Sequence, residues 1–448
     1  MIIEAIAQHT ADIPTQKIWI AGAIFVATYG IILTERINRA VVALLGAGLM
    51  ILLGVVSQSQ AFMSIDGNTI GLLLGMMIVV AVMKESGVFQ YVAVKSAKVV
   101  KADAVGTLMV LAVVTAVFSA LLDNVTTVLL TTPVILQITR EMRVNSFPYL
   151  FTSILASNIG GTATLIGDPP NIMIGSAAHL SFMDFIYNVA PVSLVVLPLT
   201  LIPIYFIWRK ELVATPENRA RIMQMNENEC ITDGELLVKS LFCMGLILAG
   251  FIVGHSYHIM PATIALTGAG LLLLLDNIHH HSEKQHEKIH TAIAESEWVT
   301  LFFFAGLFII VHAVEHVGII DRLAQEMLAF TGGDKNTTMT VILWGAAILS
   351  AIVDNIPFVA TMIPLIQSMG DTFGGEEGLR SLWWALSLGA CLGGNGSLIG
   401  ASANLVVAGL AEKGGHSIGF VKFMFYAFPL MMMSIVISQI YLYLRYMV

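Results

Sequence analysis

Two parts of this chain repeat one another, and the repeat includes polar residues set among apolar ones. SALLDNVTTVLLTTPVI at 119–135 aligns without gaps with SAIVDNIPFVATMIPLI at 350–366. A second pair, GGTATLIGDPPN at 160–171 and GGNGSLIGASAN at 393–404, aligns at nearly the same separation. Unrelated apolar helices would share Leu and Ile, whereas these segments share Asp-Asn and Gly-Gly. We infer that the chain contains two copies of one structural unit.

The rest of the chain is apolar in long blocks. Hydrophobic residues make up 57% and charged residues 12% of the 448 positions, against about 25% charged in soluble proteins. Many blocks approach the roughly 20 residues that a helix needs to cross a bilayer, and none alternates with the period of a barrel strand. The fold class is therefore predicted as an all-α polytopic membrane protein. The blocks almost free of charge lie at 20–34, 38–56, 68–83, 185–207, 239–254, 261–276, 298–314 and 417–443.

Lys and Arg in the loops predict the orientation, because these residues concentrate on the cytoplasmic side. They flank the segment 104–140 and fill 209–238, whereas the flanks of 338–370 contain few. We predict a re-entrant hairpin at 104–140 entering from the cytoplasm and a second at 338–370 entering from outside. With five spans and one hairpin in each half, about ten transmembrane helices result. An odd number of spans per half gives two inverted-topology repeats. The predicted units are 1–208 for the first repeat, 209–238 for a cytoplasmic linker and 239–448 for the second repeat.

The hairpin tips carry the first chemical signal. A carboxylate near the bilayer centre costs about 2.5–3.5 kcal/mol on insertion scales, so such a residue marks a candidate functional site. Asp123 and Asp354 occupy equivalent positions and are predicted to couple transport to protons. Each could also cap the helix that follows it, and the two roles are compatible. The neighbours Asn124, Thr126, Thr127 and Asn355 are predicted to bind the solute or ion.

A glycine-rich interruption follows each hairpin and provides the second signal. Paired glycines and Asp168-Pro169 predict that the spans at 148–175 and 381–409 break into half-helices. A broken span is tolerated only where the freed backbone groups face protein or a water-filled cavity. Close packing through small residues is an alternative reason for the glycines, but it does not account for the polar residues beside them. The residues predicted to bind the solute here are Asn158, Thr162, Thr164, Asn171, Asn395, Ser397, Ser402 and Asn404.

Other functions find little support in the sequence. It contains no Walker A motif, no basic stripe for nucleic acid, and three cysteines without metal-ligand spacing. We predict no enzyme activity, no cofactor, no bound metal and no nucleic-acid partner. The histidine-rich segment 279–290 is interpreted as a solvated cytoplasmic linker, with metal or pH sensing as the alternative.

Four segments resemble a known family: DNVTTVLLTTPV, SNIGGTATLIGDPPNIMI, DNIPFVATMIP and ACLGGNGSLIGASAN. They are similar to the ArsB/NhaD group of the ion-transporter superfamily, and most of all to its melanosomal P protein-like members. The likeness extends from about residue 20 to 445. It implies a citrate-transporter-like fold, a homodimer that moves solute by an elevator motion, and an integral protein of the cytoplasmic (inner) membrane of a prokaryote.

The resemblance leaves several substrates open. We expect proton-coupled efflux of a small inorganic solute, with arsenite or antimonite favoured, and an ATPase subunit as a further partner in that case. Cys391, just before the second break, could contact such a thiophilic solute, although ordinary packing is the alternative. Bacterial arsenite pumps look more like Asn-Asp and Asn-Asn at the two tips, whereas both tips here read Asp-Asn. Sodium/proton antiport is the second hypothesis, and organic-anion transport or a channel is the third.

Overall fold

The computed structural model describes residues 14–447, which form helices and no strands. Seven helices in this part of the chain are long and apolar enough to cross a membrane. The prediction of an all-α polytopic protein is confirmed. These helices are α2 (Thr15–Thr34), α5 (Gly67–Lys84), α7 (Ala104–Leu121), α12 (Ala190–Trp208), α14 (Gly234–Gly254), α17 (Trp298–His316) and α24 (Phe420–Leu442).

The remaining helices complete the two halves or lie at their edges. Those that form hairpins, breaks and short spans are α3 (Arg39–Leu52), α8 (Asn124–Met142), α9 (Phe147–Thr162), α10 (Pro169–Ala177), α15 (Pro261–Asn277), α19 (Lys335–Ile352), α20 (Asn355–Gln367), α22 (Gly375–Gly393) and α23 (Ser402–Lys413). The connecting helices are α4 (Gln58–Met63), α6 (Val88–Val99), α11 (Phe182–Asn188), α13 (Pro216–Gln224), α16 (Ser282–Ala294), α18 (Ile319–Phe330) and α21 (Gly370–Phe373).

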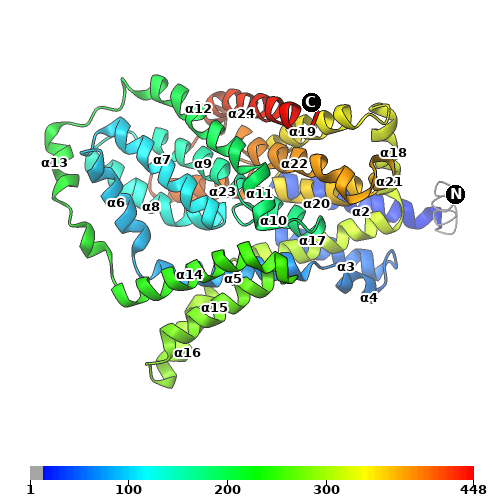
Figure 1. Cartoon of the computed structure of the whole chain (residues 1–448), viewed down its shortest axis with the longest axis horizontal. Helices are drawn as coiled ribbons and strands as arrows, with labels where there is room; N and C mark the ends of the chain where they lie inside the picture. The colour runs from blue at the N-terminus through cyan, green and yellow to red at the C-terminus, as the bar shows by residue number, and fades with distance from the viewer. Residues whose placement is uncertain (1–13, 448) are drawn as a thin grey trace.

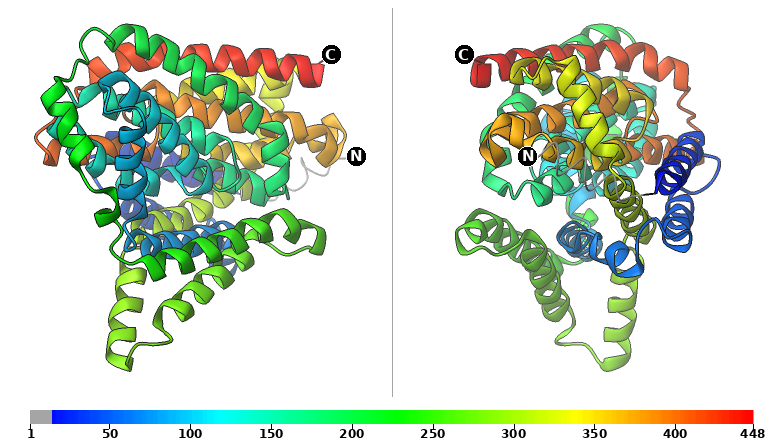
Figure 2. Two further views of the ribbon diagram at one scale, coloured as in Figure 1. Left: turned by 60° about the vertical axis from the view of Figure 1, so that its left-hand side comes forward. Right: turned by 90° about the vertical axis from the view of Figure 1, so that its right-hand side faces the viewer.

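The halves interlock rather than stand side by side. Helix α5 packs on α15 of the other half, and its counterpart α17 packs on α3. A Cβ on Gly75 would lie 2.7 Å from the Ala265 carbonyl carbon, and one on Gly306 would lie 2.7 Å from that of Ala43. The same close helix contact therefore occurs twice, each time between halves. Figures 1 and 2 show α5, α14 and α15 as one group, with α16 projecting from it and the hairpins and breaks lying above.

The two hairpins turn at their Asp-Asn pairs. Asp123 is the N-cap of α8 and accepts a hydrogen bond from the Thr126 backbone N–H, with an Oδ1–N distance of 2.8 Å. Asp354 caps α20 in the same way, accepting from the Ile356 N–H at 3.1 Å. Each carboxylate thus satisfies a backbone donor that the start of a helix leaves without an intrahelical partner.

Each of the two polar connections makes polar contacts with the helical body. In the segment between α12 and α14, Glu227 forms an ion pair with Lys98 of α6 at 2.5 Å, and the Thr232 N–H donates to the Ser86 carbonyl at 3.1 Å. The histidine-rich segment 279–290, which we interpreted as a solvated linker, is mostly exposed and lies largely in the helix α16. Lys288 of α16 forms an ion pair with Asp276 at 2.8 Å.

Candidate functional site between the hairpin tips and the broken helices

Each hairpin lies against the break of its own half through matching hydrogen bonds. Thr164 Oγ1 donates to the Ala120 carbonyl at 2.7 Å, and Ser397 Oγ donates to the equivalent Ala351 carbonyl at 2.5 Å. At the first tip, the Asn124 N–H also donates to the Gly167 carbonyl at 3.0 Å. The structure therefore places the Asp-Asn tips directly beside the glycine-rich breaks.

One asparagine in each half holds its break in shape. Asn171 Nδ2 donates to the Thr162 and Thr164 carbonyls at 3.0 and 2.9 Å. Asn404 Nδ2 donates to the Gly394 and Ser397 carbonyls, both at 2.8 Å. These amides satisfy carbonyl groups that the end of a helix would leave unpaired. Asn171 and Asn404 thus support the unwound backbone from within the protein.

A buried amide network joins the halves. Asn158 Nδ2 donates to Asn395 Oδ1 at 3.0 Å and to Asn404 Oδ1 at 2.9 Å. In the repeat, Cys391 aligns with Asn158, and its Sγ donates to Asn171 Oδ1 at 3.4 Å. The Cys391 side chain is fully buried. Its position is that of a network residue, which favours the packing interpretation over contact with a thiophilic solute.

The residues predicted to bind the solute gather at this one place. All of them are buried except Thr126, which is half-buried. Many of their polar atoms already have partners within the protein, as the Thr162 hydroxyl does on the Asn158 carbonyl at 2.7 Å. Much of the predicted set therefore shapes the breaks, and fewer oxygens are left to meet a solute.

The second tip contains a cation that the sequence interpretation missed. Arg39 Nη1 lies 2.5 Å from Asp354 Oδ2 and 2.5 Å from Ser402 Oγ. Arg39 lies at the start of the apolar block 38–56, and the structure makes it the first residue of α3, with its guanidinium at the site. The pair is 315 positions apart in sequence, and no local pattern predicts it.

The first break contains a carboxylate that was missed in the same way. Asp168 is the N-cap residue of α10, yet its side chain makes no capping hydrogen bond. Its Oδ1 accepts from Asn355 Nδ2 of the other half at 3.4 Å, and its buried Oδ2 has no hydrogen-bond partner among residues 14–447. The Cys391 thiol and Asn124 lie beside the same carboxyl group. A comparison of the two copies would have indicated this residue, since Asp168 aligns with Ala401 in an otherwise similar segment.

The site has unused oxygens and excess negative charge. In the described chain, Asn124 Oδ1 and Thr127 Oγ1 are also buried without partners. Such atoms are uncommon in folded proteins and call for an explanation, such as a bound ion. Of the carboxylates of Asp123, Asp168 and Asp354, only that of Asp354 forms an ion pair within residues 14–447, with Arg39. A small cation with a preference for oxygen ligands suits this environment.

A large cavity lies between the two groups of helices. Its volume is about 930 Å³, and it is lined from α5, α14, α15 and α17 on one side and from α10 and α20 on the other. Leu165 and Ile172, next to the first break, belong to its lining, as do Asp66, His312 and Glu315. The cavity therefore extends along the boundary between the interlocked spans and the broken helices.

Comparisons with known proteins place the chain among transporters. A family described as "Citrate transporter" matches residues 29–389. An uncharacterized transporter of Mycobacterium tuberculosis is 41% identical over 433 residues, which cover 96% of this chain and 99% of that protein. The P protein of Mus musculus is 31% identical, with 96% of this chain and 60% of that protein covered.

A solved structure shares the fold. The YdaH transporter of Alcanivorax borkumensis superimposes with a TM-score of 0.53 at 14% identity, covering 88% of each chain. At this identity the likeness concerns the arrangement of helices. Together, the relatives and the fold identify an integral membrane transporter.

Proposed function

Because the chain belongs to the citrate transporter family, we propose that it is a secondary transporter driven by sodium, which binds at the first hairpin tip. The sodium ligands would be the unpartnered oxygens Asp168 Oδ2, Asn124 Oδ1 and Thr127 Oγ1, supplemented by carbonyl oxygens of the first break. Unwound helices that offer carbonyl oxygens to sodium or protons recur in transporters.

The observation that carries this proposal is the unpartnered Asp168 oxygen. Its carboxylate is 1% exposed, bonded on one oxygen to the opposite half and on the other to no residue of the described chain. An ionised carboxylate buried in that state is strongly disfavoured unless a cation or a proton accompanies it. Sodium needs several oxygen ligands, whereas a proton would bind to the Asp168 carboxyl group alone. The unpartnered neutral oxygens of Asn124 and Thr127 therefore favour sodium over a proton.

The arrangement also suggests how the ion and the carried solute would be linked. Asp168 lies on the first broken helix and contacts Asn355 at the second tip. An ion that draws Asp168 and Asn124 together would thereby fix both tips and both breaks around one site. Solute would then bind best when sodium is present, which is the condition for coupled transport.

For the carried solute, an organic anion is the second part of the proposal. The half-helices α10 and α23 begin at the two breaks, and such half-helix N-termini point at anionic solute groups in other transporters. The family description points to citrate, and bound sodium would offset the charge of the carboxylates nearby. Arsenite efflux draws no support from Cys391, because its thiol is enclosed and donates to Asn171.

The experiment uses purified protein in lipid vesicles of prokaryotic composition, the membrane type we expect from the bacterial relatives. Exchange of radioactive sodium across the vesicle membrane should be abolished by Asp168→Asn and kept by Asp371→Asn, an exposed aspartate of α21. Sodium-dependent uptake of citrate and of arsenite is then compared in the same vesicles. Wild-type sodium exchange in Asp168→Asn would overturn the proposed ion site, and sodium-independent uptake of either solute would overturn the coupling.

A further inference from the structure

The two hairpin tips have the same sequence but different electrostatic surroundings. At the first tip, Asp123 accepts hydrogen bonds from the backbone and hydroxyl of Thr126, and it forms no ion pair within residues 14–447. At the second tip, Asp354 faces a guanidinium at 2.5 Å. The duplication would lead one to expect equal partners, so the difference needs an explanation.

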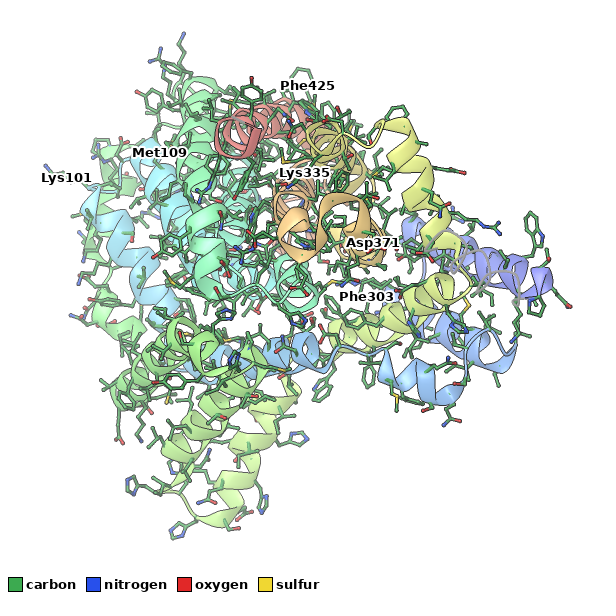
Figure 3. All side chains as sticks on the ribbon, turned by 45° about the vertical axis from the view of Figure 1, so that its right-hand side comes forward. Lys101, Met109, Phe303, Lys335, Asp371 and Phe425 are labelled. Carbon is green, nitrogen blue, oxygen red and sulfur yellow. The ribbon has the colours of Figure 1, made fainter. Side chains whose placement is uncertain are left out.

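The guanidinium at the second tip is firmly held. Arg39 Nη1 contacts Ser402 Oγ as well as Asp354, and Ser402 Oγ donates to the same Asp354 oxygen at 2.7 Å. The Arg39 guanidinium also lies over the Phe303 ring, 4.9 Å from its centroid, which adds a cation–π attraction. Figure 3 labels Phe303 on α17. Phe303 belongs to α17 and Arg39 to α3, and these two helices pack against each other. The contacts therefore hold the guanidinium at the second tip.

The first break differs from the second at the two positions beside the hairpin tip. The repeat places Pro169 where the second break has Ser402, and Asp168 where it has Ala401. The first tip therefore has two carboxylates without a cation. The second tip has one carboxylate with a permanent cation, Arg39, which the first half supplies through α3. Among these residues, a formal charge of −2 at the first tip stands against a neutral pair at the second. Two further carboxylates lie near Arg39: Glu35, and Glu297, which accepts from Thr300 Oγ1 at 3.3 Å.

We propose that Arg39 is a built-in counter-ion that occupies the place of a coupling cation at the second tip, so that this transporter binds one sodium per chain instead of two. The inference rests on the proposed function, because it takes sodium as the coupling ion. Its consequence is that removing the guanidinium exposes a second cation site at Asp354, Ser402 and Thr300. Thr300 Oγ1 now lies 3.5 Å from Arg39 Nη2 and would face the new ion.

The test counts bound sodium at equilibrium with the radioactive ion on purified protein kept in sodium throughout. Wild type is expected to bind one sodium per chain, and Arg39→Gln two. Arg36→Gln, which changes an exposed arginine of the neighbouring turn, should remain at one. Arg39→Gln combined with Asp354→Asn should return to one, because the second site loses its carboxylate. A purely structural role for Arg39 would leave the count unchanged.

The outcomes separate the two proposals. One sodium in wild type and still one in a folded Arg39→Gln would overturn the counter-ion inference alone, as would two in wild type. No sodium in any variant would overturn the proposed function as well. If Arg39→Gln fails to fold in high sodium while the double variant folds, sodium does not replace the guanidinium and the inference is wrong.

Discussion

Gly160 should not tolerate an alanine, because the first break depends on close contact between α9 and α7. A Cβ at Gly160 would lie 2.1 Å from the Ala116 carbonyl oxygen and 2.6 Å from its Cα. Both atoms belong to backbone, so one helix must move. Overpacking of this kind costs about 1–3 kcal/mol, from which a helix-propensity gain of up to about 1 kcal/mol is subtracted. The difference is about 0–2 kcal/mol, and the 2.1 Å approach to a backbone atom puts Gly160→Ala at the upper end. This loss lowers the midpoint of thermal unfolding by a few degrees.

The second half provides a repeat of the same test. Gly393 aligns with Gly160, and its Cβ would lie 2.6 Å from both the Cα and the carbonyl oxygen of Ala347. Gly393→Ala should therefore be destabilising too, by somewhat less because its closest contact is longer. The control is Gly345→Ala on α19, where an added Cβ meets no atom within 4 Å. Thermal unfolding in detergent, followed by tryptophan fluorescence, gives the three midpoints. Equal midpoints for Gly160→Ala and Gly345→Ala would refute the packing argument.

Two further predictions concern the buried network and the central linker. Asn158→Ala should destabilise the protein by about 1–3 kcal/mol, because buried amide groups of the other half lose their partner. The control, Asn336→Ala at an exposed position, should change the free energy of unfolding by no more than about 0.5 kcal/mol in the same assay. Equal effects of the two substitutions would contradict the role of the network. Partial burial, followed by the charges of nearby glutamates including Glu227, raises the pKa of Cys230 above its usual 9.0. Less thiolate is then present at pH 8 than in a free cysteine, so maleimide labelling of Cys230 should be slow at pH 8 and faster above pH 9. Labelling at pH 8 should be faster in Glu227→Gln, and buried Cys391 should remain unlabelled throughout. A labelling rate that does not depend on pH would contradict this prediction.

The sequence predicted the helical class and the positions of the turns for physical reasons that act locally. Apolar blocks long enough to span a bilayer leave few alternatives to helices. The Asp-Asn pairs supply helix caps, so the start of α8 at Asn124 and of α20 at Asn355 follows from residues next to one another. The breaks were visible for the same reason, since glycines and Asp168-Pro169 interrupt a helix wherever they occur.

The charges of the site were harder to predict because they depend on tertiary contacts. Arg39 meets Asp354 only when α3 of one half reaches the second hairpin of the other, and a loop-charge rule treats it as an ordinary cytoplasmic arginine. Asp168 was interpreted as a helix cap, although it makes no capping bond. Comparing the copies position by position would have marked it, because Ala401 replaces it. Differences between repeats were more informative here than the similarities.

Electron cryo-microscopy of the purified protein, with and without sodium, tests the central claim most directly. With sodium, we expect ion density between Asn124 Oδ1 and Asp168 Oδ2, and both Asp-Asn tips against the glycine breaks. When sodium is replaced by a large organic cation, this ion density should be absent. Tips that lie apart on opposite surfaces, or an Asp168 carboxyl group with no density beside it in saturating sodium, would contradict the account.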